Sequence, residues 1–505
     1  MKTVYILFFT LTILLFSFKG FENENDNPCM YHHVNVINGQ LSLQMEDGII
    51  QGGVQVPIRR TYSSYGALEK TDDSSDLYLK RLKHGFHIQG GWNFFPQTHL
   101  LIRPGRRAEN YLAYVADASG SITKFEYSHK DTSDKTIVLT SKEKNITSYS
   151  KISGKNNWNK TLLCLNEKTG NAELKLPDGS LLFYQGRNFK ARKDEGSALT
   201  TFYTLTTEIK PNGHLVSYIY DSKDRIQEIK HLNPQAKKCF AHIKFHLDNP
   251  VSPYKFHITT SDDKTIEYNF KVESYRDYLE SVIHKSGQKQ TYDYGKERKG
   301  IGARVNKIRF DGKLQSKISY YTPENKQIEE IWRKHPENIA IYGDKVRKLE
   351  GPLGSNGEII TYAEFKYSEG VTEAKDSEGI ITKYYHSDGK LDLIEEYDIQ
   401  GQLTTKTKFI WAQDNLISKI KLDGDGSALF SKTFSYDVNG NITKEVFYGN
   451  LSGKCKDSFR ANDDGSLQEA ESFVKTFTYS EKMNLLLTEN EENGLSYKYF
   501  YEDGT

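Results

Sequence analysis

Short runs of alternating hydrophobic and polar residues cover most of the chain. Lys124–Ser128, Ser217–Tyr220 and Thr265–Phe270 are examples, and they are rich in aromatic and β-branched residues. An alternation with a period of two places the apolar side chains on one face of a strand, as in a sheet that buries only that face. Long stretches with helical periodicity are nearly absent. The pattern therefore predicts an all-β fold built from many short strands.

Turn-forming dipeptides separate these runs. Asn or Asp followed by Gly supplies the positive φ angles that two-residue hairpin loops need. The stretch Gly449–Ala470 looks least like strand and is predicted to be a loop or an inserted excursion. The dipeptides occur at Asp178–Gly179, Asn212–Gly213, Asp388–Gly389, Asn439–Gly440, Asn493–Gly494 and Asp503–Gly504.

Some of these turns repeat in a fixed frame. Tyr397–Leu403 and Tyr436–Ile442 both read Tyr-Asp-x-x-Gly-x-[Leu/Ile], and Tyr220–Ile226 follows the frame with Asp224 in place of the glycine. We expect the Tyr to end one strand and the Asp to cap the turn through its own backbone. The Gly then takes the left-handed conformation, and the aliphatic residue opens the next strand.

The repeated units resemble the YD repeats of the RHS (rearrangement hotspot) family. Asp47–Ser64 resembles the N-terminal segment of that family, which has an acidic residue, a Gly-x-x-x-Pro stretch and an Arg-x-Tyr-Ser-Ser close. A Gly-Trp pair follows in the family, and Gly91–Trp92 corresponds to it here. The resemblance covers about residues 29–505 and is thin between 130 and 200.

The resemblance implies an architecture. RHS-type repeats form a long antiparallel β-sheet that spirals into a hollow shell, and in complete members the shell encloses a C-terminal effector, usually a toxin. The sequence has no core-closing Asp-Pro-x-Gly-Leu segment and no toxin-like tail. We therefore expect a truncated or split gene product, or a short member whose shell a second RHS chain completes. The expected domains are an RHS-type N-terminal β domain at 29–130 and a YD-repeat sheet at 131–505, truncated at its C-terminus.

The N-terminus predicts the compartment. Met1 and Lys2 precede an apolar run, Val4–Phe18, which is typical of a signal peptide over residues 1–20. The run is short for a membrane span, which needs about 20 residues. No small-residue cleavage pair follows it, so an uncleaved anchor remains an alternative. In either case we expect an exported protein, secreted or associated with the cell envelope.

Charge and cysteine content exclude some classes of function. The chain has 68 Lys+Arg and 67 Asp+Glu, a net charge of +1, which argues against broad electrostatic attraction to nucleic acid or anionic membranes. Its four cysteines, Cys29, Cys164, Cys239 and Cys455, form no Cys-x-x-Cys pair, which excludes a zinc ribbon or a thioredoxin-like motif. Two disulfides with three connectivities, or four isolated thiols, are both compatible with this spacing.

No group of residues predicts catalysis, a metal site or a cofactor. His32 and His33 are adjacent, and neighbours on a strand point to opposite faces, so we expect them not to share a metal. The acidic pairs lack the full calcium-loop pattern and are read as solvated turns. Two basic stretches are read as solvated turn or edge charges. The acidic pairs are Asp262–Asp263, Asp423–Asp425 and Asp463–Asp464, and the basic stretches are Lys296–Lys299 and Lys406–Lys408.

Two functions of different class are compatible with the sequence. The first is an exported, non-catalytic scaffold that encapsulates or presents a polypeptide effector. The alternative is a cell-surface adhesin whose tyrosine-lined sheet binds carbohydrate. Tyrosines that face a closed interior favour the scaffold, whereas an exposed aromatic patch of several hundred Å² favours the adhesin.

The apolar run makes a first prediction. Replacing Leu14 and Leu15 with Asp should cost several kcal/mol of apolar transfer and leave the protein in the cytoplasm. Cell fractionation measures this. Unchanged export would show that the segment belongs to the fold.

Overall fold

The structure of the protein is a computed structural model. It describes residues 28–50, 56–64, 91–94, 99–103, 111–116, 122–131, 136–140, 162–166, 168–176, 180–187, 201–210, 213–222, 225–249, 253, 255–273, 276–295, 304–321, 345–353, 357–412, 415–437, 441–479 and 486–500. The described residues contain strands and turns and no helix, which confirms the predicted all-β class. None of them forms a helix that could cross a membrane. The apolar run Val4–Phe18 lies outside the described residues.

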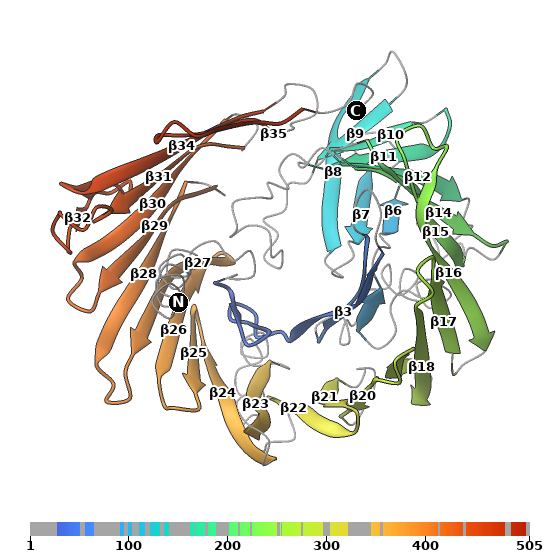
Figure 1. Ribbon diagram of the computed structural model, residues 1–505, viewed down its shortest axis with the longest axis horizontal. Helices are drawn as coiled ribbons and strands as arrows, with labels where there is room; N and C mark the ends of the chain where they lie inside the picture. The colour runs from blue at the N-terminus through green and yellow to red at the C-terminus, as the bar shows by residue number, and fades with distance from the viewer. Residues whose placement is uncertain are drawn as a thin grey trace, which may run out of the picture.

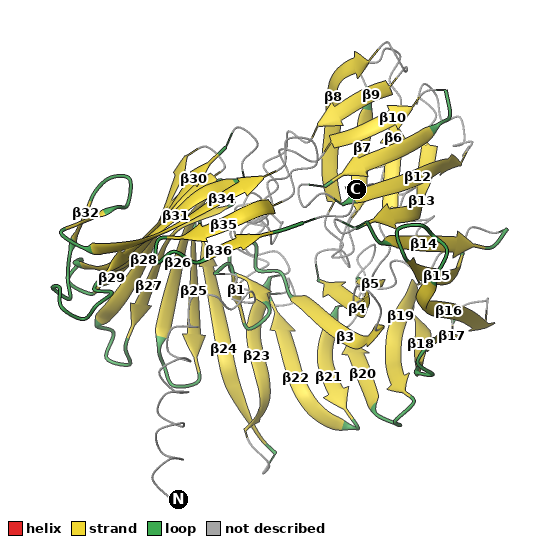
Figure 2. Cartoon of the chain, turned by 45° about the horizontal axis from the view of Figure 1, so that its top comes forward, coloured by secondary structure: helices red, strands yellow, loops and turns green. Residues whose placement is uncertain are grey.

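The first strands of the long antiparallel sheet form a ring. Each pairs with the next along the chain, and β6 also pairs with β13, through Leu101 opposite Phe202. Eight strands therefore follow one another around a closed circuit (Figure 2). They are β6 (His99–Arg103), β7 (Leu112–Ala116), β8 (Ile122–Asp131), β9 (Thr136–Thr140), β10 (Leu162–Asn166), β11 (Asn171–Lys175), β12 (Leu181–Arg187) and β13 (Thr201–Ile209).

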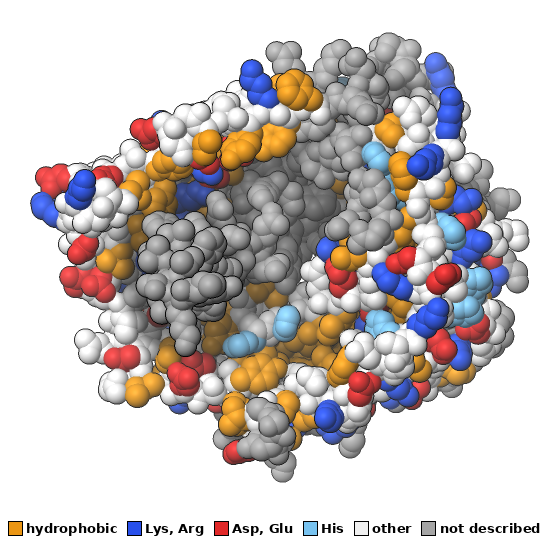
Figure 3. Space-filling model, in the orientation of Figure 1, with side chains coloured by type: hydrophobic (Ala, Val, Ile, Leu, Met, Phe, Trp, Pro, Cys, Tyr) orange, Lys and Arg blue, Asp and Glu red, His pale blue; other side chains and the backbone are white. Residues whose placement is uncertain are grey.

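From β13 the sheet continues strand by strand in sequence order and curves (Figure 1). The space-filling view shows a hollow on the inner side of this curve (Figure 3). The sheet as a whole does not close into one barrel. Its strands are β14 (Leu215–Tyr220), β15 (Ile226–Leu232), β16 (Cys239–Asn249), β17 (Lys255–Thr260), β18 (Thr265–Glu273), β19 (Arg276–His284), β20 (Lys289–Tyr294), β21 (Val305–Phe310), β22 (Lys313–Tyr320), β23 (Val346–Leu353), β24 (Glu358–Ser368), β25 (Val371–Asp376), β26 (Ile381–Ser387), β27 (Lys390–Tyr397), β28 (Leu403–Ala412), β29 (Asn415–Asp423), β30 (Ala428–Tyr436), β31 (Ile442–Gly449), β34 (Glu471–Tyr479), β35 (Leu486–Glu491) and β36 (Ser496–Lys498).

A recurring hydrogen bond joins an aromatic side chain on one strand of this sheet to a backbone carbonyl on the preceding strand. Tyr294 ends β20 opposite Val305, which opens β21, and the register shifts at this pair, as at a β-bulge. Tyr320, at the end of β22, donates its hydroxyl to the carbonyl of Val305 at 2.9 Å. A bulge leaves one strand residue unpaired in the ladder. The Tyr320 hydroxyl, from the strand that follows, therefore gives the Val305 carbonyl a hydrogen-bond donor at this bulge.

The same bond occurs seven times, and we call these contacts the bulge bonds. In every case the acceptor residue lies at a register shift in its pairing with the preceding strand. Besides Tyr320 to Val305, the donor–acceptor pairs are Tyr220 to Leu205, Tyr294 to Leu279, Tyr367 to Val346, Trp411 to Leu391, Tyr436 to Leu416 and Tyr479 to Ile442.

Tyr367 is buried in the sheet, and the other six donors are half-buried. Burial raises the pKa of Tyr294, Tyr320 and Tyr367 well above the ordinary value for tyrosine, so these hydroxyls keep their protons. Because bulges bend a strand and increase its twist, the register shifts that recur along the sheet account for its curvature.

The Tyr-Asp-x-x-Gly frame forms the turns that the sequence predicts. Asp398 accepts hydrogen bonds at Oδ1 from the backbone N–H of Gln400 at 3.0 Å and of Gln402 at 2.7 Å. Gly401 has φ +80°, in the left-handed region. Asp437 caps its turn in the same way, through the backbone N–H of Asn441 at 2.9 Å. Gly440 lies outside the described residues.

A separate three-stranded sheet lies inside the curve (Figure 1). We call it the inner sheet, and beside it lies a small hairpin, β1–β2. Both pack on the concave side of the long sheet, in one continuous hydrophobic core with it. The inner sheet consists of β3 (Ser42–Ile50), β4 (Val56–Ser63) and β5 (Trp92–Phe94), and the hairpin of β1 (Met30–Tyr31) and β2 (Val34–Asn35).

The segment between β31 and β34 forms a flap on the opposite, convex side. It carries the hairpin of β32 (Arg460–Ala461) and β33 (Leu467–Gln468), and Ser431 of β30 donates a hydrogen bond to the carbonyl of Gly465 at 2.7 Å. The predicted excursion at Gly449–Ala470 is therefore confirmed.

Two other expectations are resolved by the structure. Lys406–Lys408 was expected at a turn or sheet edge. This is wrong, because the stretch lies inside β28, which is paired on both sides. None of the four cysteines forms a disulfide, so of the two alternatives the structure has the one without disulfides. The basic stretch Lys296–Lys299 lies outside the described residues.

Gly401 provides a test of the turn frame. No atom lies within 4 Å of the place where a Cβ would sit, so a substitution there meets only the backbone preference. Gly401→Ala should lower the free energy of unfolding by about 1–2 kcal/mol, and Gly401→Asn by less, because Asn tolerates the left-handed region. Denaturant unfolding measures both. Equal stability of Gly401→Ala and the parent would contradict this turn geometry.

Candidate functional site

The concave face of the long sheet is the candidate site, and the inner sheet covers part of it. Asp47 of β3 and Arg60 of β4 point from the inner sheet toward the side chains of β18 and β20. The Arg60 side chain is fully buried, and that of Asp47 is nearly so. A buried charge is costly unless it is paired and hydrogen-bonded, so the partners of these two groups decide whether the inner sheet can dock.

Arg60 is saturated with acceptors. Its Nε and Nη2 donate to the two oxygens of Asp47 at 2.6 and 2.7 Å, its Nη1 to the Tyr292 hydroxyl at 2.6 Å, and Nη2 also to Oε1 of Gln290 at 2.7 Å. Burial alone would lower the pKa of the Arg60 guanidinium, but the Asp47 carboxylate holds the pKa above its ordinary value. The bidentate pair is therefore a fixed ion pair in a dry interface.

Aromatic side chains complete this contact. The Tyr268 hydroxyl donates to Asp47 at 2.8 Å, and the Arg60 guanidinium lies 5.2 Å from the centre of the Trp92 ring. The Trp92 indole N–H donates to the Tyr294 hydroxyl at 3.0 Å. Tyr62 of β4 accepts at its hydroxyl from the backbone N–H of Val305 at 3.0 Å. The inner sheet thus docks on the bulge that opens β21.

Further along the sheet, at β28–β35, the concave face carries phenylalanines and paired charges. Phe447 and Phe473 lie directly opposite each other on β31 and β34, and Phe430 packs on Phe447 at 5.8 Å between ring centres. The charges on this face are balanced across strands. Lys421 binds Glu396 at 2.7 Å, Lys432 binds Glu445 at 2.6 Å, and Lys475 binds Glu491 at 2.8 Å.

Strand register places these side chains on the same face as the β1–β2 hairpin. Tyr384 lies opposite Ile394, which lies opposite Thr407, and Thr407 lies opposite Lys421. Tyr31 of the hairpin contacts Tyr384, with ring centres 6.3 Å apart. The flap contacts the residues that alternate with these along the same strands, such as Ser431 of β30, and it therefore lies on the opposite face of the sheet. Figure 3 shows hydrophobic side chains along the inner rim of these strands, facing the hollow. The concave face is therefore apolar and charge-neutral.

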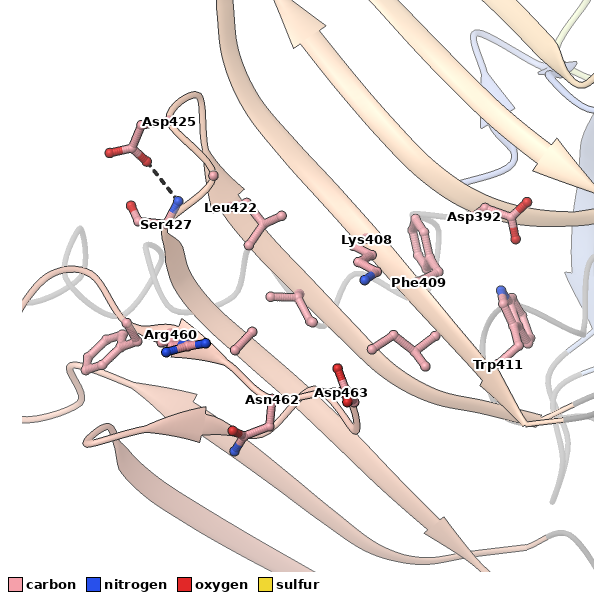
Figure 4. A pocket seen from close by; sticks show the side chains of 15 residues that line it. Asp392, Lys408, Phe409, Trp411, Leu422, Asp425, Ser427, Arg460, Asn462 and Asp463 are labelled. Atoms are coloured by element: carbon pink, nitrogen blue, oxygen red, sulfur yellow. Dashed lines mark hydrogen bonds between the residues drawn. The ribbon is translucent and has the colours of Figure 1, made fainter.

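A second cleft lies on the convex side, between β27–β29 and the flap (Figure 4). It has a volume of about 780 Å³. Lys408 and Trp411 of β28 line one side, and Arg460 and Asp463 of the flap line the other. Asp425 points away from the centre and accepts from the Ser427 N–H at 2.8 Å. The cleft combines an apolar floor with charges of both signs.

The acidic pairs proposed as turns are turns. Asp262 pairs with Lys264 at 2.7 Å in the β17–β18 turn, and hydrogen bonds from Lys264 and Thr260 lower its pKa. Asp464 accepts from the Ser466 N–H at 2.9 Å in the flap. Within the described ranges, no three His, Cys, Asp or Glu side chains are grouped so that they could hold a metal.

His32 and His33 are not on a strand, contrary to expectation. They form the turn of the β1–β2 hairpin, and both line one cavity. The argument that they must point to opposite faces therefore fails. The sequence also gave no role to Asp47 and Arg60, although both lie in the N-terminal segment that carries the family resemblance. The signal in the sequence is two adjacent charges of each sign, Glu46–Asp47 on one strand and Arg59–Arg60 on the next, and it does not tell which of the two pairs is buried.

Comparison with known proteins gives loose structural likenesses. The Photorhabdus luminescens Tc holotoxin pore aligns over 91% of this chain and 25% of that chain, with 11% identity and a TM-score of 0.28. The TcdB2–TccC3 complex aligns over 91% and 26%, with 10% identity and a TM-score of 0.28. The N-terminal domain of the effector SpvB from Salmonella typhimurium aligns over 53% and 98%, with 9% identity and a TM-score of 0.20.

The chain thus spans about a quarter of the length of the Tc toxin chains to which it is similar. TM-scores at this level establish neither a shared family nor a shared function. No family model matches the sequence. No curated protein matches it either.

The buried ion pair makes a third prediction, and its neighbour is the control. Arg60→Ala should lower the free energy of unfolding by about 3–5 kcal/mol, because it leaves Asp47 buried without its partner. Arg59→Ala removes the adjacent arginine, whose pair with Glu46 is about 40% exposed on both sides, and should cost about 0–1 kcal/mol. Denaturant unfolding of the two variants measures the difference. Similar losses would show that Arg60 does not hold the inner sheet.

Proposed function

We propose that this protein is an exported, non-catalytic β-shell scaffold that holds a polypeptide against its concave face. Three observations support the proposal: the RHS-type sequence resemblance, the apolar run Val4–Phe18, and a curved sheet with a hollow on its inner side (Figure 3). No residue acts as a catalyst in this account. The concave face acts by excluding water from a bound chain and by shielding that chain from solvent.

The observation that carries the proposal is the chemistry of the concave face at β28–β35. Phe430, Phe447 and Phe473 are half-buried there, and the neighbouring lysines are neutralised by glutamates. A half-buried apolar surface gains free energy when another chain covers it. Because each of these lysines is paired with a glutamate, the face attracts neither anionic nor cationic ligands strongly. Such a face suits an unfolded or partly folded polypeptide better than a nucleic acid or an anionic surface.

The direction of the tyrosines also supports a scaffold over a glycan-binding surface. Tyr268, Tyr292 and Tyr384 are buried on the concave side, where they contact the inner sheet or the β1–β2 hairpin. They pack the shell from within and do not form an outward-facing aromatic patch. Sugar rings that stack on aromatic faces would need those faces exposed.

Site-specific photo-crosslinking in the producing cells tests the proposal. A benzophenone amino acid at Phe447 or Phe473 should give one major adduct with a polypeptide, identified by mass spectrometry. The matched controls are Lys444 and Thr476, which lie opposite each other on the same two strands and point to the convex side. They should give no such adduct. Equal adducts from both faces, or none from the concave face, would contradict the proposal, and glycan adducts would favour the adhesin.

A further inference from the structure

A cavity of about 390 Å³ lies between the turn of the β1–β2 hairpin, strand β3 of the inner sheet and strands β20–β24 of the long sheet. Most of its apolar lining is itself buried. Five of the lining side chains are at most 8% exposed, and they are Leu41, Leu43, Ile308, Ile318 and Leu349. The cavity therefore reaches into the core between the two sheets and is not a shallow dent in the surface.

The size of this cavity is unusual for a protein interior. Interiors are close-packed, and an empty apolar cavity lowers stability in proportion to its volume. An apolar cavity of only about 150 Å³ already takes up benzene. Pockets that bind small ligands have about 300–1,000 Å³, a mostly apolar lining and a few polar groups. In size and lining, this cavity fits a small apolar ligand.

Two polar residues of the lining already have partners. Oε1 of Gln290 accepts hydrogen bonds from Arg60 at 2.7 Å and from Tyr292 at 2.9 Å. The Arg309 guanidinium pairs with Asp293 at 2.5 Å. Neither the Gln290 carbonyl oxygen nor the Arg309 charge is therefore available to decide which ligand binds.

Ser316 and Tyr362 supply a hydrogen-bond donor that is still available. Their hydroxyls lie 2.8 Å apart, and one of the two protons makes the bond between them. Among the described residues this hydroxyl pair has no further hydrogen-bond partner, so the second proton can be donated to a ligand. Burial raises the pKa of Tyr362, which keeps its hydroxyl protonated. The Tyr362 ring lies against Gly351, where a Cβ would come within 3.0 Å of it.

The hairpin turn is the exposed end of the cavity. His32 and His33 are exposed and also line the cavity, as does the exposed Gln315 beside Ser316. The His32 ring packs edge-on against Tyr362, with ring centres 5.3 Å apart, so the imidazole lies beside the hydroxyl pair. Strand β3 contributes only apolar side chains, Leu43 and Met45. The cavity thus has polar donors at the turn and an apolar wall on the inner sheet.

We propose that this cavity binds a free fatty acid, with its alkyl chain between β3 and the long sheet and its carboxylate at the Ser316–Tyr362 hydroxyl pair and the hairpin histidines. The available groups donate hydrogen bonds, and a carboxylate accepts them. At the exposed turn the carboxylate also keeps contact with water, so its charge is not buried. The site is separate from the concave face at β28–β35 and does not depend on a polypeptide bound there.

Calorimetric titration of the unmodified protein tests the binding. The probes are hexanoate, octanoate, decanoate, dodecanoate and tetradecanoate, each below the concentration at which it forms micelles. One molecule should bind per chain, and the affinity should rise about fourfold for each added CH₂ until the chain fills the cavity, then level off. No saturable binding at any chain length, or an affinity that never levels off, as on an unspecific apolar surface, would overturn the proposal.

Photo-labelling of the same protein locates the chain. A dodecanoate with a diazirine at its last carbon should label the lining at Leu43, Met45 or Ile308, as identified by mass spectrometry, and excess decanoate should prevent the labelling. Labelling confined to exposed apolar side chains, such as Phe500 at 88% exposure, would contradict the proposal. This measurement needs no variant to fold.

A filled cavity should not bind. Met45 is half-buried in the lining, so the larger side chain in Met45→Trp can occupy the cavity. It should lower the affinity for decanoate at least about tenfold without lowering the Tm. The matched control is Leu353→Trp, on the same strand as Leu349, because the Leu353 side chain is 48% exposed and does not line the cavity. A folded Met45→Trp protein that binds decanoate as tightly as the control does would overturn the site.

The hydroxyl pair tests the position of the carboxylate. The double variant Ser316→Ala/Tyr362→Phe keeps the Tyr362 ring and removes both hydroxyls. It should weaken decanoate binding about tenfold, as expected for a lost hydrogen bond to a charged group, and leave the fourfold step per CH₂ unchanged. An undiminished affinity would overturn the assignment of the carboxylate to this pair.

Discussion

A buried carbonyl at a β-bulge needs a hydrogen-bond donor, and in this protein an aromatic side chain from the following hairpin supplies it. An unsatisfied buried carbonyl costs about 1–3 kcal/mol. The seven bulge bonds therefore tie seven of the register shifts in the sheet to the strand that follows. Tyr320, for example, ends β22 and pairs with Val346 of β23, and its hydroxyl donates to the Val305 carbonyl of β21. One residue therefore contacts both neighbouring strands at their register shifts. The curvature of the sheet depends on this repeated contact.

The hollow and its contents depend on that curvature. Because the sheet bends, its concave face can surround the inner sheet, and the Tyr62 hydroxyl reaches the backbone N–H of Val305 at one of the bulges. The Arg60–Asp47 pair is tolerable only because β18 and β20 bring Tyr268, Tyr292 and Gln290 around it. Docking specificity thus comes from satisfied polar groups, and stability comes from the apolar core around them.

Much of the fold could be predicted from the sequence, because it is encoded locally. The Tyr-Asp-x-x-Gly frame predicts where a strand ends, which Asp accepts hydrogen bonds from the turn, and which residue has a positive φ. Asp398 and Gly401 confirm the last two. The ring closed by β6 and β13, the docking of Arg60, and the place of His32 and His33 could not be predicted. These depend on contacts between residues far apart in the chain, such as Arg60 with Tyr292, for which one sequence holds no local signal.

The free-energy cost of losing one bulge bond tests this account most directly. Tyr436→Phe removes the hydroxyl that donates to the Leu416 carbonyl at 2.7 Å, and Tyr497→Phe removes one from a side chain on β36 that is 49% exposed. Denaturant unfolding should show a loss of about 1–3 kcal/mol for Tyr436→Phe and less than about 0.5 kcal/mol for Tyr497→Phe. Equal losses, or none for Tyr436→Phe, would contradict the claim that the bulge bonds hold the curved sheet together.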